Sequence, residues 1–86
     1  MKKSKKLTEK QKETLCKTIG SLIREKRKKM GYSQEALGME TDIHRTYIGI
    51  IERGESNVTI EMLATIANVL ECEIEEFIPS FSVIKK

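Results

Sequence analysis

The apolar positions of the first long segment of the chain recur at helical spacing. Five of them fall on one stripe: Leu15, Ile19, Leu22, Ile23 and Met30. Lysine and arginine residues occupy the opposite side of the same segment. Gly31 follows this stripe, as a glycine typically does at the end of a helix. The pattern predicts an amphipathic helix that packs one face on a core and ends at Gly31.

The rest of the chain predicts four shorter helices. Ser33 and Thr59 are suitable N-caps, and Gly54 and Pro79 are suitable stop signals. The expected helices cover about residues 34–40, 45–53, 60–70 and 73 or 74 to 78. No segment has the pattern of a convincing strand. We therefore predict an all-α fold of five helices.

Two of the short helices are separated by a turn of three residues. Thr41, Asp42 and Ile43 form this turn, and Asp tolerates the unusual backbone that it needs. Two helices with this spacing, residues 34–53, are typical of a helix-turn-helix. In that motif the second helix enters the major groove of DNA.

The second helix of the pair has a polar face suited to DNA. With Ile48 and Ile51 directed into the core, a rotation of 100° per residue turns Thr46 and Arg53 outward. Arg45 is able to form a bidentate pair with guanine. We expect base contacts from Arg45, Thr46, Tyr47, Gly49 and Ile50.

Each of these residues, taken alone, also has a structural explanation. Arg45 would be a solvated charge, Tyr47 an aromatic residue at the core edge, and Gly49 a glycine that the helix tolerates at a cost of about 1 kcal/mol. Their combination on one helix, after a turn of the right length, favours DNA binding.

A second group of polar residues is expected to contact phosphates. Gln34 stands at a helix N-terminus, where free N–H groups and the helix dipole attract anions. His44 stands at the head of the next helix, where it would cap that helix or contact a phosphate. The expected phosphate contacts are Ser33, Gln34, His44, Arg53, Ser56 and Asn57.

The charge is divided unevenly along the chain. Residues 1–54 carry 14 Lys and Arg against 7 Asp and Glu, whereas residues 55–86 carry 2 Lys against 6 Glu. A basic front is consistent with a phosphate partner. We expect a flexible basic arm at residues 1–12, which either binds phosphates or is only solvated. The predicted domain then spans residues 13–79, and residues 80–86 form a short tail.

Several classes of function are disfavoured by the sequence. The chain has room for one domain, and it lacks both a membrane-spanning run and a signal peptide, so we expect a cytoplasmic protein without a membrane partner. Cys16 and Cys72 have neither metal-ligand spacing nor a nearby His. No catalytic set is present. We expect no enzyme activity, metal, cofactor or small-molecule ligand.

The segment 60–70 carries more apolar surface than one core-facing stripe requires. One apolar stripe consists of Ile60, Leu63, Ala67 and Leu70. A second apolar stripe lies beside it on the same helix, and this second stripe needs another partner to cover it. Either a second copy of the chain covers this second stripe, or the arm or tail folds back over it. The dimer interface expected from it consists of Met62, Ile66, Val69, Phe77, Ile78 and Phe81.

Three segments together resemble the phage-repressor/Cro-like helix-turn-helix family. They are Ile19-Gly20-Ser21-Leu22-Ile23-Arg24-Glu25-Lys26-Arg27, Gly31-Tyr32-Ser33-Gln34-Glu35-Ala36-Leu37 and Ile48-Gly49-Ile50-Ile51-Glu52-Arg53-Gly54. The likeness covers about residues 17–78. Residues 44–48, together with 52–54 and Asn57, look most like the controller proteins of restriction–modification systems.

The resemblance implies a five-helix, repressor-like DNA-binding domain. It implies that Gln34 binds a phosphate, that Arg45, Thr46 and Tyr47 meet the operator, and that the last two helices make the dimer contact. It also implies a structural ion pair between Arg27 and Glu52. The expected function is a homodimeric transcription regulator on a palindromic operator in double-stranded DNA. The alternative is a protein-interaction module, or an antitoxin-type or phage-type repressor on the same fold.

Overall fold

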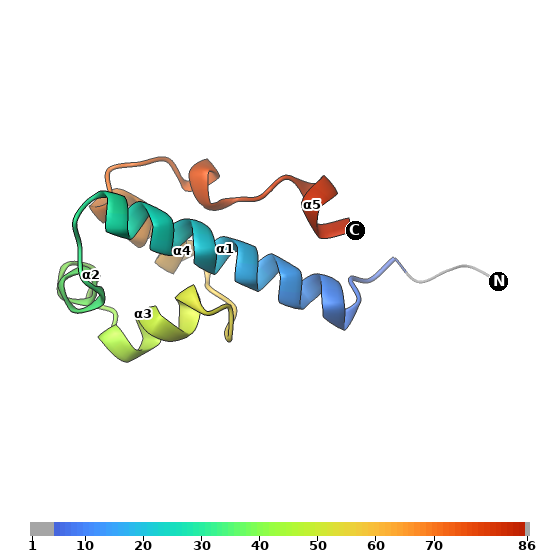
Figure 1. Cartoon of the computed structure of the whole chain (residues 1–86), viewed down its shortest axis with the longest axis horizontal. Helices are drawn as coiled ribbons and strands as arrows, with labels where there is room; N and C mark the ends of the chain where they lie inside the picture. The colour runs from blue at the N-terminus through green and yellow to red at the C-terminus, as the bar shows by residue number, and fades with distance from the viewer. Residues whose placement is uncertain (1–4, 86) are drawn as a thin grey trace.

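The structure, a computed structural model, describes residues 5–85, which contain five α-helices and no strand (Figure 1). The helices are α1 (Glu9–Lys29), α2 (Gln34–Thr41), α3 (Arg45–Glu52), α4 (Ile60–Val69) and α5 (Phe81–Lys85), with a short 3-10 helix, η1 (Ile74–Phe77), before α5. The all-α prediction is confirmed. Residues 1–4 of the predicted arm and Lys86 of the predicted tail lie outside the described residues.

The first helix begins earlier than the sequence analysis predicted. The Thr8 side chain accepts a hydrogen bond from Gln11 N (3.0 Å), and the Gln11 side chain accepts one from Thr8 N (2.9 Å). This reciprocal capping box satisfies two N–H groups that a helix start leaves free. Residues 9–12, which the sequence assigned to the basic arm, therefore belong to α1.

The core lies between α1, α2, α3, α4 and η1. Ile48 and Ile51 of α3 are buried in it, as predicted. The buried side chains of this core include Ile23, Leu37, Ile48, Ile51, Leu63, Ile66, Leu70 and Phe77. Met30 was placed on the buried stripe of the first helix, but it is 38% exposed. It is the C-cap residue of α1, where the helix ends.

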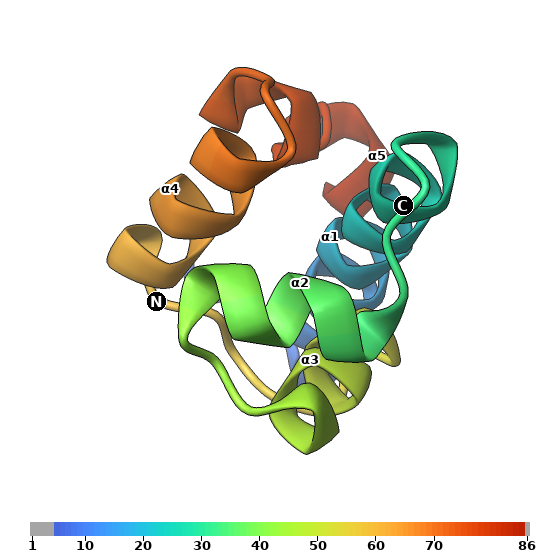
Figure 2. The same cartoon turned by 90° about the vertical axis from the view of Figure 1, so that its left-hand side faces the viewer.

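A close crossing of α1 and α3 fixes where α3 lies. Gly20 of α1 is buried, and a Cβ atom at this position would stand 2.3 Å from the carbonyl oxygen of Ile51. Only glycine allows the two backbones to approach this closely. In Figure 2, α2 crosses in front of α3 at one end of the molecule, so that the two helices are held as a pair against α1 and α4.

The C-terminal segment folds back along α1 (Figure 1). The predicted last helix is the 3-10 helix η1, and the predicted tail at residues 80–86 contains a further helix, α5. Ile84 of α5 is 2% exposed, which explains why this tail is ordered. The segment that the sequence assigned to a tail therefore packs one of its side chains against the domain.

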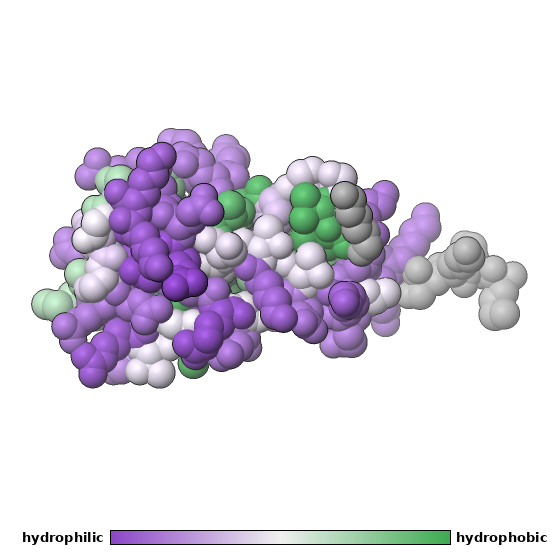
Figure 3. Space-filling view, viewed as in Figure 1, coloured by the Kyte–Doolittle hydropathy of each residue, from purple (hydrophilic) through white to green (hydrophobic). Residues whose placement is uncertain are grey.

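Two residues of the predicted dimer interface belong to the core of a single chain. Ile66 is 0% exposed and Phe77 is 1% exposed, because η1 packs on α4 and brings Phe77 inside. Met62 and Val69 are half-buried against the same core, and Ile78 and Phe81 are exposed. Apolar surface is visible over α5 and the segment before it in Figure 3. None of the helices described in residues 5–85 has the length and apolar character needed to cross a membrane.

Candidate DNA-binding surface

The turn between α2 and α3 has the geometry that its residues predict. Asp42 adopts a left-handed conformation (φ 60°, ψ 26°) at the C-cap of α2, and Ile43 N donates to Gly38 O at 3.1 Å. The Thr41 hydroxyl donates to Leu37 O at 2.8 Å. His44 then caps α3, since its Nδ1 accepts from Thr46 N at 3.1 Å. The capping role, one of two expected for His44, is therefore present.

The outer face of α3 begins with two exposed polar residues, Arg45 and Thr46. Ile50, one turn further along, is half-buried. Hydrogen-bonding side chains in the first turn of such a helix are the ones that reach base edges in a major groove. The structure therefore leaves the Arg45 and Thr46 side chains free of the core, where a nucleic acid is able to meet them.

Gly49 lies deeper than the sequence analysis expected. It is buried, and a Cβ atom there would meet Arg53 Nη1 at 3.1 Å and Gln34 Oε1 at 3.6 Å. The missing side chain makes room for these two protein side chains. Gly49, which the sequence placed on the base-contacting face, is therefore buried beneath Gln34 and Arg53.

Tyr47 connects α3 to the loop that follows it. Its ring packs against the core, and its hydroxyl donates to Asn57 O (3.2 Å) and lies 3.1 Å from Ser56 Oγ. The side chain of Asn57 is held from the other side, because Cys16 Sγ donates to its Oδ1 at 3.0 Å. The loop residues predicted to contact phosphates are thus positioned by α1 and α3 together.

A buried ion pair lies beneath this surface. Arg27 Nε donates to Glu52 Oε2 at 2.6 Å and Arg27 Nη2 to Glu52 Oε1 at 3.0 Å, while Arg27 Nη1 donates to Tyr32 O at 2.8 Å. Gln34 Nε2 also donates to Glu52 Oε1, at 3.1 Å. The ion pair expected from the resemblance is present, and it joins α1, α3 and the N-terminus of α2.

Arg24 is a cationic residue that the sequence analysis missed. It lines a surface cavity together with Arg27, Gln34, Glu52 and Arg53. Arg24 is exposed and stands one turn before Arg27 on α1. The spacing of three residues between the two arginines was the available signal, because residues at i and i+3 share a helix face. Arg24 of α1, Gln34 of α2 and Arg53 at the C-cap of α3 therefore border one cavity.

The other predicted phosphate contacts are partly occupied. The Ser33 hydroxyl caps α2 by accepting from Ala36 N at 2.9 Å. Arg53 Nε donates to Glu55 Oε2 at 3.1 Å in an exposed pair. Lys17 of α1 lies against Gly54, in the loop that follows α3. A hydrogen bond from its ammonium to the Glu13 carboxylate raises the pKa of Lys17, so Lys17 is charged at neutral pH.

Comparisons with known proteins agree with this geometry. Residues 23–77 match the helix-turn-helix family. The chain is 43% identical over 53 residues to control protein C.BamHI of Bacillus amyloliquefaciens, covering 60% of this chain and 65% of that protein. It is 41% identical over 46 residues to control protein C.SmaI of Serratia marcescens, covering 54% and 55% of the two chains.

A solved structure is similar over most of its length. The restriction-modification controller protein C.AhdI from Aeromonas hydrophila has a TM-score of 0.70 and 34% identity, covering 72% of this chain and 94% of that chain. By contrast, the aligned region spans only 65% and 55% of the length of the two control proteins above.

Proposed function

This chain belongs to the helix-turn-helix family, a family of regulators that are not enzymes, and we propose that it is a DNA-binding controller protein of a restriction–modification system. The observation that carries the proposal is the outer face of α3. There Arg45 and Thr46 are exposed in the first turn, and Arg53, at the C-cap of the same helix, borders a cavity with Arg24 of α1. Hydrogen-bonding groups flanked by cations suit a major groove and its phosphates.

The proposed contacts divide into two kinds. Arg45 and Thr46 meet base edges, with Ile50 beside them for a thymine methyl group. Arg24 and Arg53 contact phosphates, as do Gln34 and the loop residues Ser56 and Asn57. Tyr47 contributes chiefly by holding that loop, since its hydroxyl is engaged by Ser56 and Asn57.

We also propose that the protein binds as a homodimer. Ile78 is 48% exposed and Phe81 is 59% exposed, so a run of apolar surface follows η1 on the outside of the domain. A second copy related by a two-fold axis would cover it. Two recognition helices would then stand about 34 Å apart, one turn of DNA, which predicts a palindromic operator.

The primary test is binding to the DNA immediately upstream of the protein's own gene. A mobility-shift titration from about 50 to 200 mM salt is expected to show one preferred two-fold site, with affinity falling about 10³- to 10⁵-fold for 6–10 phosphate contacts. Absence of any preference over random DNA would contradict the proposal. That result would favour the protein-interaction or antitoxin-type alternative.

Arg24→Ala is expected to weaken binding to every DNA sequence by a similar factor. Removing one phosphate contact should reduce the slope of log affinity against log salt by about one per protomer, without changing sequence preference. The measurement is a salt titration on operator and random DNA. Lys29→Ala is the control, because Lys29 is exposed at the end of α1 and lines a different cavity, with Glu25 and Glu76. An unchanged slope for Arg24→Ala would remove Arg24 from the interface.

Ile78→Glu is expected to produce monomers. A carboxylate at the centre of an apolar contact would be desolvated without a partner, so we expect at least about 30-fold weaker association. Sedimentation at micromolar protein concentration checks this directly. Met30→Glu, at an exposed apolar residue on the end of α1, serves as the control. A dimer that survives Ile78→Glu would place the interface elsewhere.

A further inference from the structure

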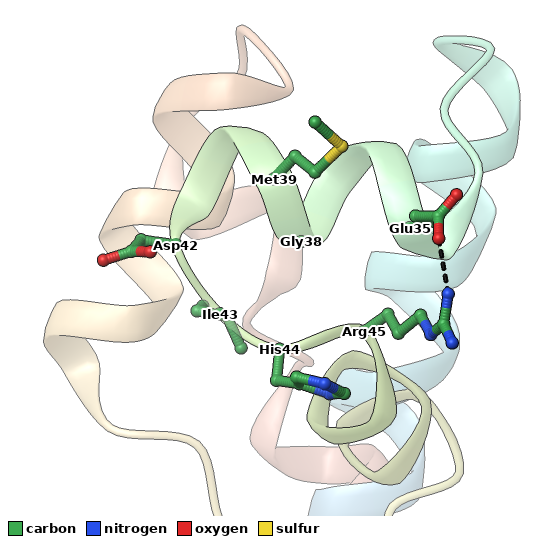
Figure 4. Close-up of a pocket in the computed structure, with 7 residues that line it drawn as sticks. All are labelled: Glu35, Gly38, Met39, Asp42, Ile43, His44 and Arg45. Atoms are coloured by element: carbon green, nitrogen blue, oxygen red, sulfur yellow. Dashed lines mark hydrogen bonds and ion pairs between the residues drawn. The ribbon is translucent and has the colours of Figure 1, made fainter.

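Arg45 is already paired in the free protein. Its Nη1 donates to Oε2 of Glu35, which stands in the first turn of α2, and the two side chains point toward one another across the gap between the helices (Figure 4). Both are well exposed, at 62% for Arg45 and 63% for Glu35. The contact therefore joins a proposed base-contacting side chain to the neighbouring helix in a place that solvent and DNA both reach.

The pair leaves most of the Arg45 guanidinium available. A guanidinium has five N–H donors in a fixed planar fork, and a bidentate contact with guanine uses two of them. Among residues 5–85 the only hydrogen bond of the Arg45 side chain is the one to Glu35. The remaining edge of the fork is able to meet O6 and N7 of a guanine while Glu35 holds the other side.

The charge of Glu35 has a second consequence. An unpaired arginine at this position would be attracted to any phosphate, irrespective of sequence. With a carboxylate beside it, the net charge of the pair is close to zero, so its attraction to the backbone is small. The directional hydrogen bonds to a base remain, because they depend on the geometry of the fork and not on net charge.

We propose that Glu35 is a positioning residue that sets the specificity of the base contact made by Arg45. Glu35 orients the guanidinium toward a guanine and discourages its use as a general phosphate contact. The inference rests on the proposed DNA-binding function and adds to it a residue on the first helix of the motif. The neighbouring carboxylate Asp42 lies at the other end of the same cavity, away from Arg45 (Figure 4).

The test compares Glu35→Gln with a matched control, Glu55→Gln. Glu55 also forms an exposed ion pair with an arginine at this surface, at 57% and 58% exposure, but its partner is Arg53. Both variants remove one negative charge from a similar environment. Only the Glu35 variant alters the surroundings of Arg45. Thermal melting should show that both variants fold like the wild type.

The probe is a duplex selected by the wild-type protein from a randomised DNA pool, with single-base variants of it and one random duplex. The guanine that Arg45 contacts is identified by comparing two proteins on the same duplexes. Its replacement weakens binding by the wild type but does not weaken binding by Arg45→Ala. In the wild type its replacement is expected to cost about 5- to 150-fold in affinity. In Glu35→Gln we expect that penalty to shrink by about two- to fivefold, the range that an exposed ion pair allows. Affinity for random DNA should rise.

The outcomes separate this inference from the proposed function. If Glu55→Gln preserves the guanine penalty and Glu35→Gln reduces it, the positioning role is supported. If the wild type selects a site and Glu35→Gln keeps the full penalty, the inference is overturned and the proposed function stands. If the wild type selects no sequence from the pool, the proposed function fails, and the role of Glu35 fails with it.

Discussion

Replacing Glu52 with alanine is expected to lower the free energy of unfolding by about 3–5 kcal/mol, the cost of breaking a buried ion pair from one side. The Arg27 and Glu52 side chains are only 8% and 2% exposed. After the replacement Arg27 keeps one hydrogen bond, to Tyr32 O, and its charge is left without a counterion. A small domain has a total stability of about 5–15 kcal/mol, so the variant should be close to unfolding.

Thermal and urea unfolding check this expectation. For a domain of this size the loss corresponds to a fall of roughly 12–40 °C in Tm. The informative control replaces both partners, Arg27→Met with Glu52→Leu, which removes the uncompensated charge and is expected to recover most of the stability. If the double variant is no more stable than Glu52→Ala, the loss comes from packing and hydrogen bonding to Gln34 instead of from an unpaired charge.

Arg45→Ala is expected to remove the discrimination at the guanine that Arg45 contacts and to weaken operator binding severely, while leaving the fold and the dimer intact. The side chain is exposed, so its removal costs little stability. A bidentate arginine–guanine contact provides about 1–3 kcal/mol of discrimination, and a symmetric dimer would lose it twice. We therefore expect operator affinity to fall roughly 30- to 10⁴-fold, measured by titration against operator and random DNA.

Arg45→Lys separates geometry from charge at the same position. Lysine retains the positive charge but lacks the planar fork that matches guanine O6 and N7. We expect Arg45→Lys to lose most of the discrimination and to keep the salt dependence of the wild type. Operator affinity that is unaltered in both variants would show that α3 does not contact bases through Arg45.

Local signals in the sequence were sufficient to predict most helices. Ser33 and Thr59 cap α2 and α4 through their hydroxyl oxygens, as their positions indicated. Gly31 and Gly54 adopt positive φ angles of 82° and 73° where helices end. These features depend on hydrogen bonds and backbone preferences within a few residues, so the sequence contains them directly. The missed start of α1 was also local, since Thr8 and Gln11 have the spacing of a capping box.

The candidate surface was predicted only in part. The helical period correctly placed Ile48 and Ile51 inside and left Arg45 and Thr46 outside. It did not show that Gln34 and Arg53 cover Gly49, because these residues come from different helices or turns. It also did not show that Arg24 shares a cavity with Arg53, or that Glu35 reaches Arg45. Such contacts depend on how helices cross.

The sequence by itself determined most of the helices, the caps of α2 and α4, and the inward direction of Ile48 and Ile51 on α3. The tertiary structure decided which apolar stripes remain for a partner. The sequence pattern does not distinguish Ile66 and Phe77 from residues of a dimer interface, yet both are buried within one chain. Ile84, in the segment predicted to be a tail, is buried as well. Helical periodicity is a local property that identifies an apolar face. What covers that face depends on the path of distant segments, and only the folded chain shows that path.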